Sequence, residues 1–263
     1  MRFALGRGLE ILLGSADRHT PIECRQASIH LGRLPAGLAG IRLAIVSDLH
    51  YGRFIRDEYV RRVVETVNAA RVDVVCLVGD LIEKYPSEAR RVGKILQRLR
   101  ARLGVFGCLG NHEHFARAPR KIATIYRHYG VDLLINQHRR LTVGGGHLVL
   151  AGVDDLRKGR ADTRKALAGV NGADPVVLMA HSPDQAEAIP DGLGVDLILS
   201  GHTHGGQVVL GGRALVTHTV HKQYTEGLSQ GPRCPVYVTR GVGTVMIPIR
   251  VNCRPEIAIL RLE

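Results

Sequence analysis

Aromatic residues are scarce in this chain of 263 residues: Phe, Trp and Tyr together make up 4% of it, and there is no tryptophan. Proteins that hold single-stranded nucleic acid commonly stack the bases on aromatic rings. A base-stacking surface is therefore poorly supplied here, which disfavours nucleic acid as the partner.

Cysteine is scarce too, and no two cysteines have the CxxC spacing. The five cysteines are Cys24, Cys76, Cys108, Cys234 and Cys253. An odd number of scattered cysteines predicts neither a disulfide framework nor a structural zinc site, and it fits a reducing cytoplasm. We expect Cys76 and Cys108, which lie in apolar runs, to be buried free thiols.

Long apolar runs are missing as well. No segment approaches the run of about 20 apolar residues that spans a bilayer. The apolar stretch 3–13 is short and is interrupted by Arg7 and Glu10. We expect it to form a terminal helix or strand packed on the domain, and neither a secretory signal nor a membrane anchor.

Acidic residues are in the minority: 24 Asp and Glu stand against 36 Lys and Arg, which gives a formal net charge of +12. Such an excess favours anionic partners. Phosphate esters, nucleic acid and an acidic lipid surface all meet that requirement, and composition does not choose among them.

The first half of the chain alternates strand-like and helix-like patterns. Apolar runs indicate strands at residues 41–46, 72–78 and 105–109, and helical spacing of apolar residues indicates helices at 56–70, 88–103 and 119–129. This order predicts a largely parallel sheet joined by right-handed crossovers.

The second half has less helix and more strand. Residues 140–143 and 147–150 flank three glycines and predict a hairpin. Apolar runs predict strands at 176–179 and 195–199, and a final strand pair at 236–238 and 257–260. Because repeats and linkers are absent, we expect one domain over 1–263, with a motif-bearing core at about 41–263 and an N-terminal extension at 1–40.

Five short motifs place potential metal ligands directly after apolar runs. They are Asp48-Leu49-His50, Gly79-Asp80, Gly110-Asn111-His112-Glu113, Ala180-His181-Ser182 and Gly201-His202-Thr203-His204. They supply two carboxylates, one amide oxygen and at least four imidazoles, which suits a pair of divalent transition ions. Ligands of open α/β sheets bind at the carboxyl ends of the strands, so these side chains can converge on one rim. Together the motifs predict a dinuclear metallohydrolase.

Local geometry supports that convergence. Extended backbone in Asp48-x-His50 and in His202-x-His204 would point both side chains of each pair to the same side. Glycines at 79, 110 and 201 allow sharp turns and close approach of the backbone. Most other histidines are expected to be ordinary surface or half-buried residues: His19, His30, His128, His138, His147 and His218.

These residues resemble the calcineurin-like metallophosphoesterase family, whose motifs D-x-H, GD, GNH-D/E, H and GH-x-H occur in this order. Residues 201–207 and 240–244, with Pro248-Ile249-Arg250 and 255–257, look like the branch of small bacterial phosphodiesterases. Some members of that branch are UDP-2,3-diacylglucosamine pyrophosphatases in lipid A biosynthesis. The resemblance implies an α/β (α+β) fold in which two mixed β-sheets pack as a sandwich flanked by helices.

The resemblance also implies a role for each motif residue. One metal ion would be bound by Asp48, His50, Asp80 and His204, and the other by Asp80, Asn111, His181 and His202, with the Asp80 carboxylate bridging. His112 would orient the phosphate or protonate the leaving oxygen, Glu113 would set its tautomer, and Asn111 and His112 would contact the substrate. Glu113 stands where many relatives have Asp. Mixed nitrogen and oxygen ligands favour manganese, with iron or zinc as alternatives.

The reaction that follows is hydrolysis of a phosphodiester or pyrophosphate bond by a hydroxide that bridges the two metals. The substrate would be a small-molecule or lipid-linked phosphoester such as UDP-2,3-diacylglucosamine. A nuclease or cyclic-nucleotide phosphodiesterase is the alternative within the family. A non-catalytic metal-binding scaffold is the alternative of another class, and the intact ligand set argues against it.

A membrane surface is the remaining expected partner. The segment 88–103 combines an apolar stripe with six basic residues, the pattern of a helix that lies at an anionic lipid interface. A crossover helix buries its apolar face on the sheet, so we expect the stripe to be in the core and the arginines alone to supply a peripheral, salt-sensitive attachment. The N-terminal membrane segment of some branch members is missing from the sequence. We therefore expect a cytoplasmic protein in peripheral contact with the inner face of the membrane; the sequence does not indicate an oligomeric state.

Overall fold

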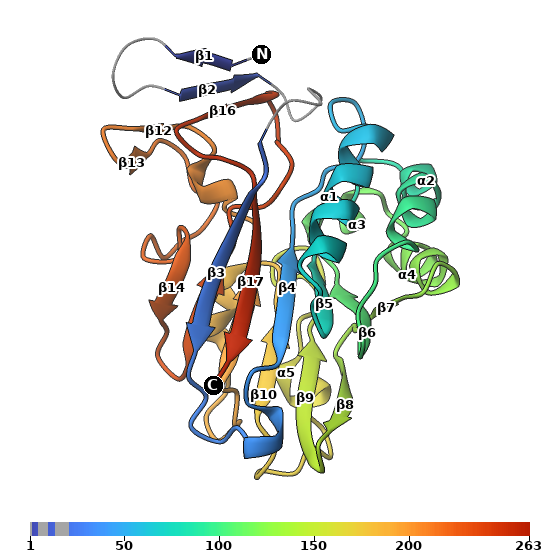
Figure 1. Cartoon of the computed structure of the whole chain (residues 1–263), viewed down its shortest axis with the longest axis vertical. Helices are drawn as coiled ribbons and strands as arrows, with labels where there is room; N and C mark the ends of the chain where they lie inside the picture. The colour runs from blue at the N-terminus through green and yellow to red at the C-terminus, as the bar shows by residue number, and fades with distance from the viewer. Residues whose placement is uncertain (1, 5–9, 14–20) are drawn as a thin grey trace.

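Two six-stranded mixed sheets form the centre of the protein (Figure 1). The structure is a computed structural model and describes residues 2–4, 10–13 and 21–263. The first sheet has the order β3 (Glu23–Ile29), β17 (Glu256–Leu262), β4 (Arg42–Val46), β5 (Val74–Val78), β6 (Gly104–Cys108) and β7 (Val131–Leu133). The second has the order β14 (Gly227–Gln230), β15 (Pro235–Val238), β11 (Leu197–Ser200), β10 (Val176–Met179), β9 (Gly146–Gly152) and β8 (Gln137–Val143).

The two sheets pack face to face because their central strands are apolar on both faces. Along β4, Leu43 and Ile45 face the second sheet and join Leu150 and Met179 in one buried cluster. Ala44 and Val46 point the other way, since side chains alternate along a strand. Strands buried on both faces read as continuous apolar runs, which is why they are recognisable in the sequence. The predicted sandwich of two mixed sheets is confirmed.

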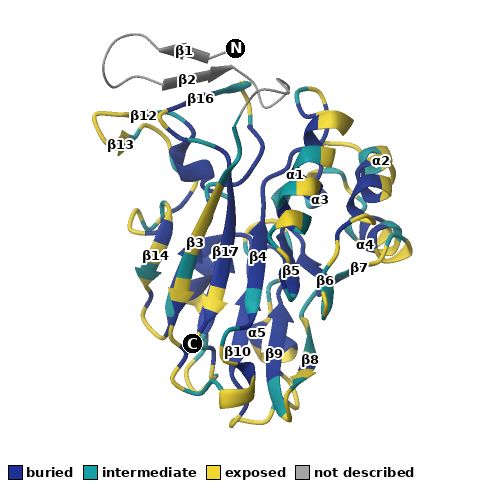
Figure 2. Cartoon of the chain, in the orientation of Figure 1, coloured by how far each residue is buried: buried dark blue, intermediate teal, exposed yellow. Residues whose placement is uncertain are grey.

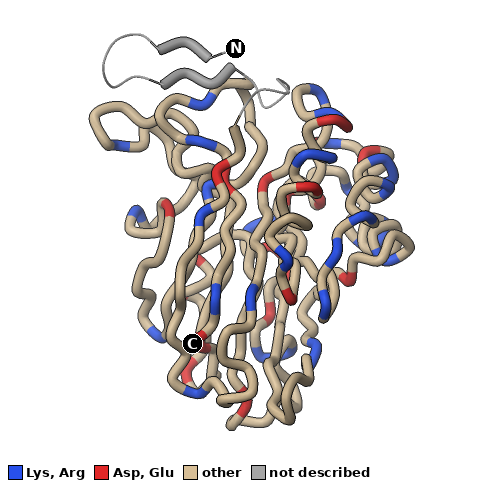
Figure 3. The backbone as a smooth tube through the Cα atoms, in the orientation of Figure 1, with Lys and Arg blue, Asp and Glu red and all other residues tan. Residues whose placement is uncertain are grey.

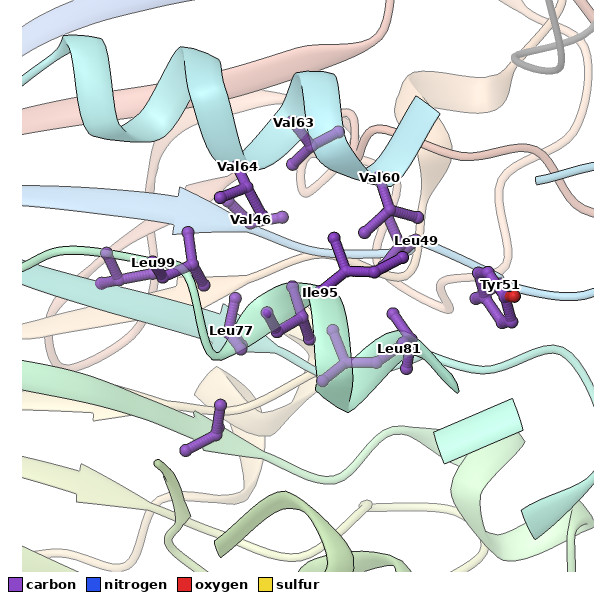
Figure 4. Packing of buried hydrophobic residues seen from close by; sticks show 14 of the residues in the cluster. Val46, Leu49, Tyr51, Val60, Val63, Val64, Leu77, Leu81, Ile95 and Leu99 are labelled. Atoms are coloured by element: carbon purple, nitrogen blue, oxygen red, sulfur yellow. The ribbon is translucent and has the colours of Figure 1, made fainter. Parts of the chain in front are cut away.

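Helices cover the outer face of each sheet. On the first sheet these are α1 (Asp57–Ala69), α2 (Pro86–Leu96) and α4 (Pro119–His128). Figure 4 shows Val60 and Val64 of α1 packed over Val46, with Ile95 of α2 beside them. The second sheet carries α5 (Thr163–Ala166) and the 3₁₀ turn η2 (Pro183–Ala188). In Figure 2 the strands are mainly buried, whereas exposed residues lie on the outer faces of the helices.

Short elements complete the chain. They are β1 (Arg2–Ala4), β2 (Glu10–Leu13), η1 (Ala36–Leu38), α3 (Asn111–Phe115), η3 (His204–Gly206), β12 (Val209–Leu210), β13 (Arg213–Ala214) and β16 (Ile249–Val251). The stretch 3–13, predicted to form a helix or strand, forms β1 and β2 where it is described, and β2 pairs with β16. Residues 5–9 of that stretch lie outside the described residues.

Strand pairing confirms some expectations and corrects one. Strands β4, β5, β6 and β7 are parallel, as the alternating pattern predicts. The final strand pair is wrong: β15 pairs with β11 and β14, whereas β17 pairs with β3 and β4 in the other sheet. Apolar content identifies a strand but not its neighbour. β3, which lies in the predicted N-terminal extension, is an edge strand of the first sheet.

The predicted helix at 88–103 ends early. α2 stops at Leu96, because the side chain of Asn68 accepts a hydrogen bond from the N–H of Arg100 and donates one to the carbonyl of Arg98. The apolar stripe of α2, including Val92, is buried in the core. This agrees with the expectation that a crossover helix buries its apolar face on the sheet, and attachment to a membrane through the basic residues alone stays a prediction. In the view of Figure 3, basic positions are spread over the helical and the strand side alike.

Candidate metal centre

The structure brings every motif to one edge of the sandwich. The motif residues Asp48, Asp80, Asn111, His181 and His202 follow β4, β5, β6, β10 and β11, in that order. These strands come from both sheets, so the site lies across the carboxyl end of the sandwich. The predicted convergence at the strand ends is confirmed.

One group of donors consists of Asp48, His50 and His204, all buried. The Nε2 atom of His204 lies 3.4 Å from Oδ1 of Asp48 and 3.1 Å from Nε2 of His50. Two ring nitrogens at that distance either share one hydrogen or point two lone pairs at the same space. The second choice is the geometry that a cation requires.

The second group consists of Asp80, His181 and His202. The Nε2 atom of His181 lies 3.2 Å from Oδ2 of Asp80 and 3.1 Å from Nδ1 of His202. Oδ2 of Asp80 is also 3.7 Å from Nε2 of His50, which belongs to the first group. The Asp80 carboxylate therefore borders both groups.

The donor set fits divalent metal ions. The Oδ1 atom of Asn111 is buried and has no hydrogen-bond partner, although it adjoins the second group in the same cavity. An unpartnered buried carbonyl is costly unless something binds it. Two carboxylates, one amide oxygen and four imidazoles turned toward one space are the mixed oxygen and nitrogen donors that transition ions accept.

Burial keeps three of the four donor histidines, His50, His202 and His204, in the neutral form that binds metal. It lowers the pKa of His50 to about 3, and it lowers the pKa of His202 to about 3 as well. Both rings are neutral near pH 7, as metal ligation requires. Burial also opposes a charge on His181, but the carboxylates of Asp80 and Asp48 outweigh it and raise its pKa well above the usual range. The same two carboxylates would attract a cation.

The backbone at these ligands is left-handed, not extended. The φ angles are 53° at Asp48, 46° at His50, 71° at His202 and 53° at His204. The expectation that extended backbone aligns each pair is therefore wrong. Left-handed conformations at non-glycine residues cost of order 1–3 kcal/mol and concentrate at functional sites, where the surrounding structure enforces them.

The three expected close approaches are confirmed, and at Gly79 a Cβ atom would overlap the imidazole of His181. A Cβ atom at Gly110 would overlap the carboxylate of Asp80, and a Cβ at Gly201 would overlap Ser47 and the carboxylate of Asp48. Both glycines therefore let neighbouring loops press against the two carboxylates. The absence of a side chain, more than the choice of φ, is what these positions require.

The predicted role of Glu113 is wrong. Its carboxylate accepts hydrogen bonds from the N–H groups of Asp80, Leu81 and Gly110 at 3.0, 2.8 and 2.8 Å. It therefore joins two metal-ligand loops and does not set the tautomer of His112. The Nδ1 atom of His112 lies 2.5 Å from the main-chain oxygen of Glu83, so it carries the proton and leaves Nε2 directed to the site.

Two residues near the centre have no predicted role. The Oε2 atom of Glu83 lies 3.6 Å from Nδ1 of His50. Arg250 is buried and donates to the carbonyls of Gly243 at 2.7 Å and His204 at 3.2 Å. Arg250 occurs in the Pro248-Ile249-Arg250 motif, so the sequence marks the residue but not its position behind a ligand. No signal marks Glu83.

A cavity of about 300 Å³ opens onto the donors. His50, Asp80, Asn111, His112, His202 and His204 line it, together with Phe115, Arg157, Lys158, His218, Val245 and Met246. His218, expected to be an ordinary histidine, is thus part of the wall. Two cations at the mouth of a cluster of metal donors favour a negatively charged substrate.

Fold and site together define a class of protein: a sandwich of two mixed sheets with a candidate dinuclear metal centre at its edge. The sandwich supplies strand ends from two sheets, and the strand ends supply two adjoining sets of metal donors beneath a cationic cavity. The chain belongs to the calcineurin-like phosphoesterase family, whose model matches residues 41–206.

Known proteins agree with this assignment. A transmembrane protein with metallophosphoesterase domain from Danio rerio is 30% identical over 95% of this chain, and the chain spans 59% of its length. The phosphodiesterase YaeI of Escherichia coli is 30% identical over 85% of this chain and 83% of its own. The sulfate thiohydrolase SoxB of Thermus thermophilus has a similar fold, with a TM-score of 0.51 at 15% identity over 84% of this chain and 57% of its own.

Proposed function

We propose that this protein hydrolyses a phosphodiester or pyrophosphate bond with two divalent metal ions. The observation that carries the proposal is the position of the Asp80 carboxylate between the two donor groups. One ion would be held by Asp48, His50, Asp80 and His204, the other by Asp80, Asn111, His181 and His202. Bound there, the ions would supply positive charge to the phosphate and lower the pKa of a water nucleophile.

Manganese is the proposed metal, with iron or zinc as alternatives. Four imidazoles among the donors favour these ions over magnesium, which prefers oxygen ligands and retains several waters. Elemental analysis of the purified protein tests both the number of ions and their identity. Fewer than one bound ion per chain, with activity unaffected by a chelator, would contradict the proposal.

The protein's own residues then position the substrate and move a proton. The cations of Arg157 and Lys158 would attract the phosphate, and Arg157 is held by Asp184 at 2.9 Å. His112 presents Nε2 to the cavity because Nδ1 is bound to the Glu83 carbonyl. From there it would donate to a phosphate oxygen or protonate the leaving oxygen.

We propose further that the substrate is amphiphilic, such as a lipid-linked phosphoester. Four apolar side chains, Leu215, Val216, Met246 and Ile247, are exposed and are called the apolar rim here; Met246 lines the cavity. Met246 is 78% exposed and has a φ of 61°. The side chain of Gln207 forms hydrogen bonds with the backbone of Val245 and Ile247. The backbone oxygen of its neighbour Val208 accepts a hydrogen bond from Leu215. The two loops of the rim are therefore connected through residues 207–208.

The rim also offers a lipid contact besides the one expected at residues 88–103. Exposed apolar side chains beside a phosphate-binding cavity fit a headgroup whose acyl chains remain near a bilayer. On this proposal the protein is cytoplasmic and peripheral on the inner face of the membrane. No helix in the described part of the chain is long and apolar enough to cross a bilayer.

Activity of manganese-loaded protein on matched substrates tests the substrate class. We expect Met246→Ser to raise KM for a phosphodiester with acyl chains and to leave KM for bis-p-nitrophenyl phosphate unchanged. Leu228→Ser, an exposed leucine on β14 outside the cavity lining, is the matched control. Equal effects on both substrates would contradict the lipid-linked substrate, and preferential cleavage of DNA or RNA would support the nuclease alternative.

A further inference from the structure

A second cavity of about 860 Å³ adjoins the metal centre. Its wall includes His114 of α3, Arg120 of α4 and the segment 158–162. Lys158 lines both this cavity and the one above the metal donors, so the two are neighbours. Nothing in the proposed reaction uses the second cavity, which we call the basic cavity.

Positive charge predominates in the basic cavity. Four cationic side chains line it: Arg120, Lys158, Arg160 and Lys165. Among the described residues, none of the four has a carboxylate within ion-pair distance, whereas the cations of Arg157 and Arg240 are paired with acids. Unpaired cations gathered around a concave surface are the electrostatic signature of an anion site.

The two acidic residues of the wall are already engaged. Asp154 lies 2.6 Å from Nε2 of His114 and accepts the N–H groups of Asp155 and Arg160, both at 2.9 Å. Asp162 caps α5 by accepting the N–H of Lys165 at 2.9 Å. Their lone pairs are therefore occupied by neighbours, and two negative charges stand against four positive ones in the wall.

The start of α4 adds to the positive potential. α4 runs from Pro119 to His128, its N-cap Ala118 gives no side-chain cap, and its first turn contains no acidic residue. Arg120 and Lys121 stand there instead, next to the positive end of the helix dipole. Cations at that end of a helix are repelled by the helix dipole, and the N–H groups of the first turn have no partner within the helix. An anion bound there would interact favourably with the cations and with the N–H groups.

The basic cavity is also rigidly built. Asn136 accepts the N–H groups of Asp154 and Asp162, both at 3.0 Å, and donates to the carbonyl of Arg160 at 2.7 Å. These bonds fix the loop that carries Lys158 and Arg160. A site that is formed before binding does not lose affinity to ordering of its loop.

We infer that the basic cavity binds a second phosphate of the substrate whose scissile phosphoester lies at the metal centre. This inference rests on the proposed function. A substrate with two phosphate groups would engage both cavities, whereas a simple diester would engage only the first. The basic cavity is therefore a specificity site, and Arg120 and Lys165 are positioned for it without contact to the metal donors.

Kinetics of the double variant Arg120→Ala/Lys165→Ala test this inference. Two p-nitrophenyl phosphodiesters are compared, identical except that one carries a terminal phosphate monoester. We expect KM for the phosphate-bearing diester to rise about tenfold, since a hydrogen bond to a charged group is worth about 1.5–3 kcal/mol and 1.4 kcal/mol is tenfold in affinity. Relative to the wild type, KM for the plain diester and kcat for both diesters should change by less than about twofold.

Arg164→Ala is the matched control, because Arg164 is exposed, adjoins Lys165 and does not line the basic cavity. It should leave both KM values unchanged. Equal KM values of the double variant and the wild type for the phosphate-bearing diester would overturn the inference. So would an equal rise for both substrates, which would place the two cations at the reacting phosphate.

A binding measurement separates this inference from the proposed function. Metal-free wild-type protein is titrated with inorganic pyrophosphate, so that resident metal ions do not bind it, and the double variant separates the basic cavity from Arg157 and Lys158 above the donors. We expect saturable binding that the double variant loses and Arg164→Ala keeps; its absence from the wild type would overturn the inference. A wild type inactive on both diesters would refute the proposed function, and the titration would still decide whether the basic cavity binds phosphate.

Discussion

At the scale of single residues, metal binding is expected to depend most on Asp80. It is the carboxylate that borders both donor groups, and its Oδ1 also accepts the N–H of His112 at 2.8 Å. We expect Asp80→Ala to lose bound metal and to lower phosphodiesterase activity by more than about 100-fold, because even partners one shell further out change metal affinity 10–100-fold. Elemental analysis and circular dichroism separate loss of metal from loss of fold.

Asp191→Ala is the control for that experiment. Asp191 is an exposed carboxylate that pairs only with Arg233 among the described residues. It should keep both metals and full activity. Two metal ions still bound to Asp80→Ala would contradict the bridging position of Asp80.

His112 has a different expected signature, because it faces the cavity without belonging to either set of proposed ligands. We expect His112→Ala to keep its metals and to lose about 10²–10⁴-fold in kcat. The loss should be larger for a poor leaving group than for p-nitrophenolate, which needs little protonation. Equal losses would assign His112 to phosphate positioning, and loss of metal would make it a ligand.

The motif residues could be predicted from the sequence. The bonds that Glu113 makes to the loops carrying the ligands could not. Ligand type and position after apolar runs were enough to find Asp48, Asp80 and His181, since strand ends converge in this kind of fold. Glu113 shows the limit. A carboxylate five positions after a strand end can bond an imidazole or a neighbouring loop, and only the fold reveals that the N–H of Leu81 lies 2.8 Å away.

At the scale of elements, apolar periodicity found the strands and helices but not their ends or partners. α1 was expected at 56–70 and spans Asp57–Ala69. α2 ends at Leu96 because Asn68, distant in sequence, bonds the chain beyond it. β15 and β17 were paired wrongly, since both are apolar and pairing depends on the path of the chain between them.

The segment 217–224 beside the cavity is held to η2 partly by the carboxylate of Asp184, which makes the stability of this contact dependent on pH. Burial of Asp184 opposes its charge, but the N–H groups of Val220 and His221, with Arg157, outweigh burial and lower its pKa below 3.8. The folded state therefore binds the proton less well than the unfolded state. Its contribution is present above pH 3.8 and is lost as pH falls through the folded pKa.

We expect Asp184→Asn to lower the free energy of unfolding at pH 7, and this deficit should shrink at a pH below the folded pKa. Urea denaturation at the two pH values measures it. Asp191→Asn, at an exposed carboxylate, is the control and should show no deficit at either pH. A deficit independent of pH would contradict the role of the Asp184 charge.

At the scale of the whole molecule, a net charge of +12 and an exposed apolar rim would act together in the proposed contact with an anionic membrane. Charge alone gives weak attachment that salt screens, since the Debye length falls from about 10 Å at 0.1 M to about 3 Å at 1 M. The composition therefore predicted an anionic partner, but the place of contact depends on loops that meet at Gln207 only in the fold.

We expect the protein to co-sediment with liposomes that contain anionic lipid at low salt and to dissociate largely at 1 M salt. The paired change Met246→Ser/Ile247→Ser should weaken binding at both salt concentrations, because it removes apolar contact and leaves the charge unchanged. Leu228→Ser should bind like the wild type. If no binding occurs at low salt and full activity appears on soluble diesters, the membrane contact is refuted, while the metal centre and its chemistry remain as proposed.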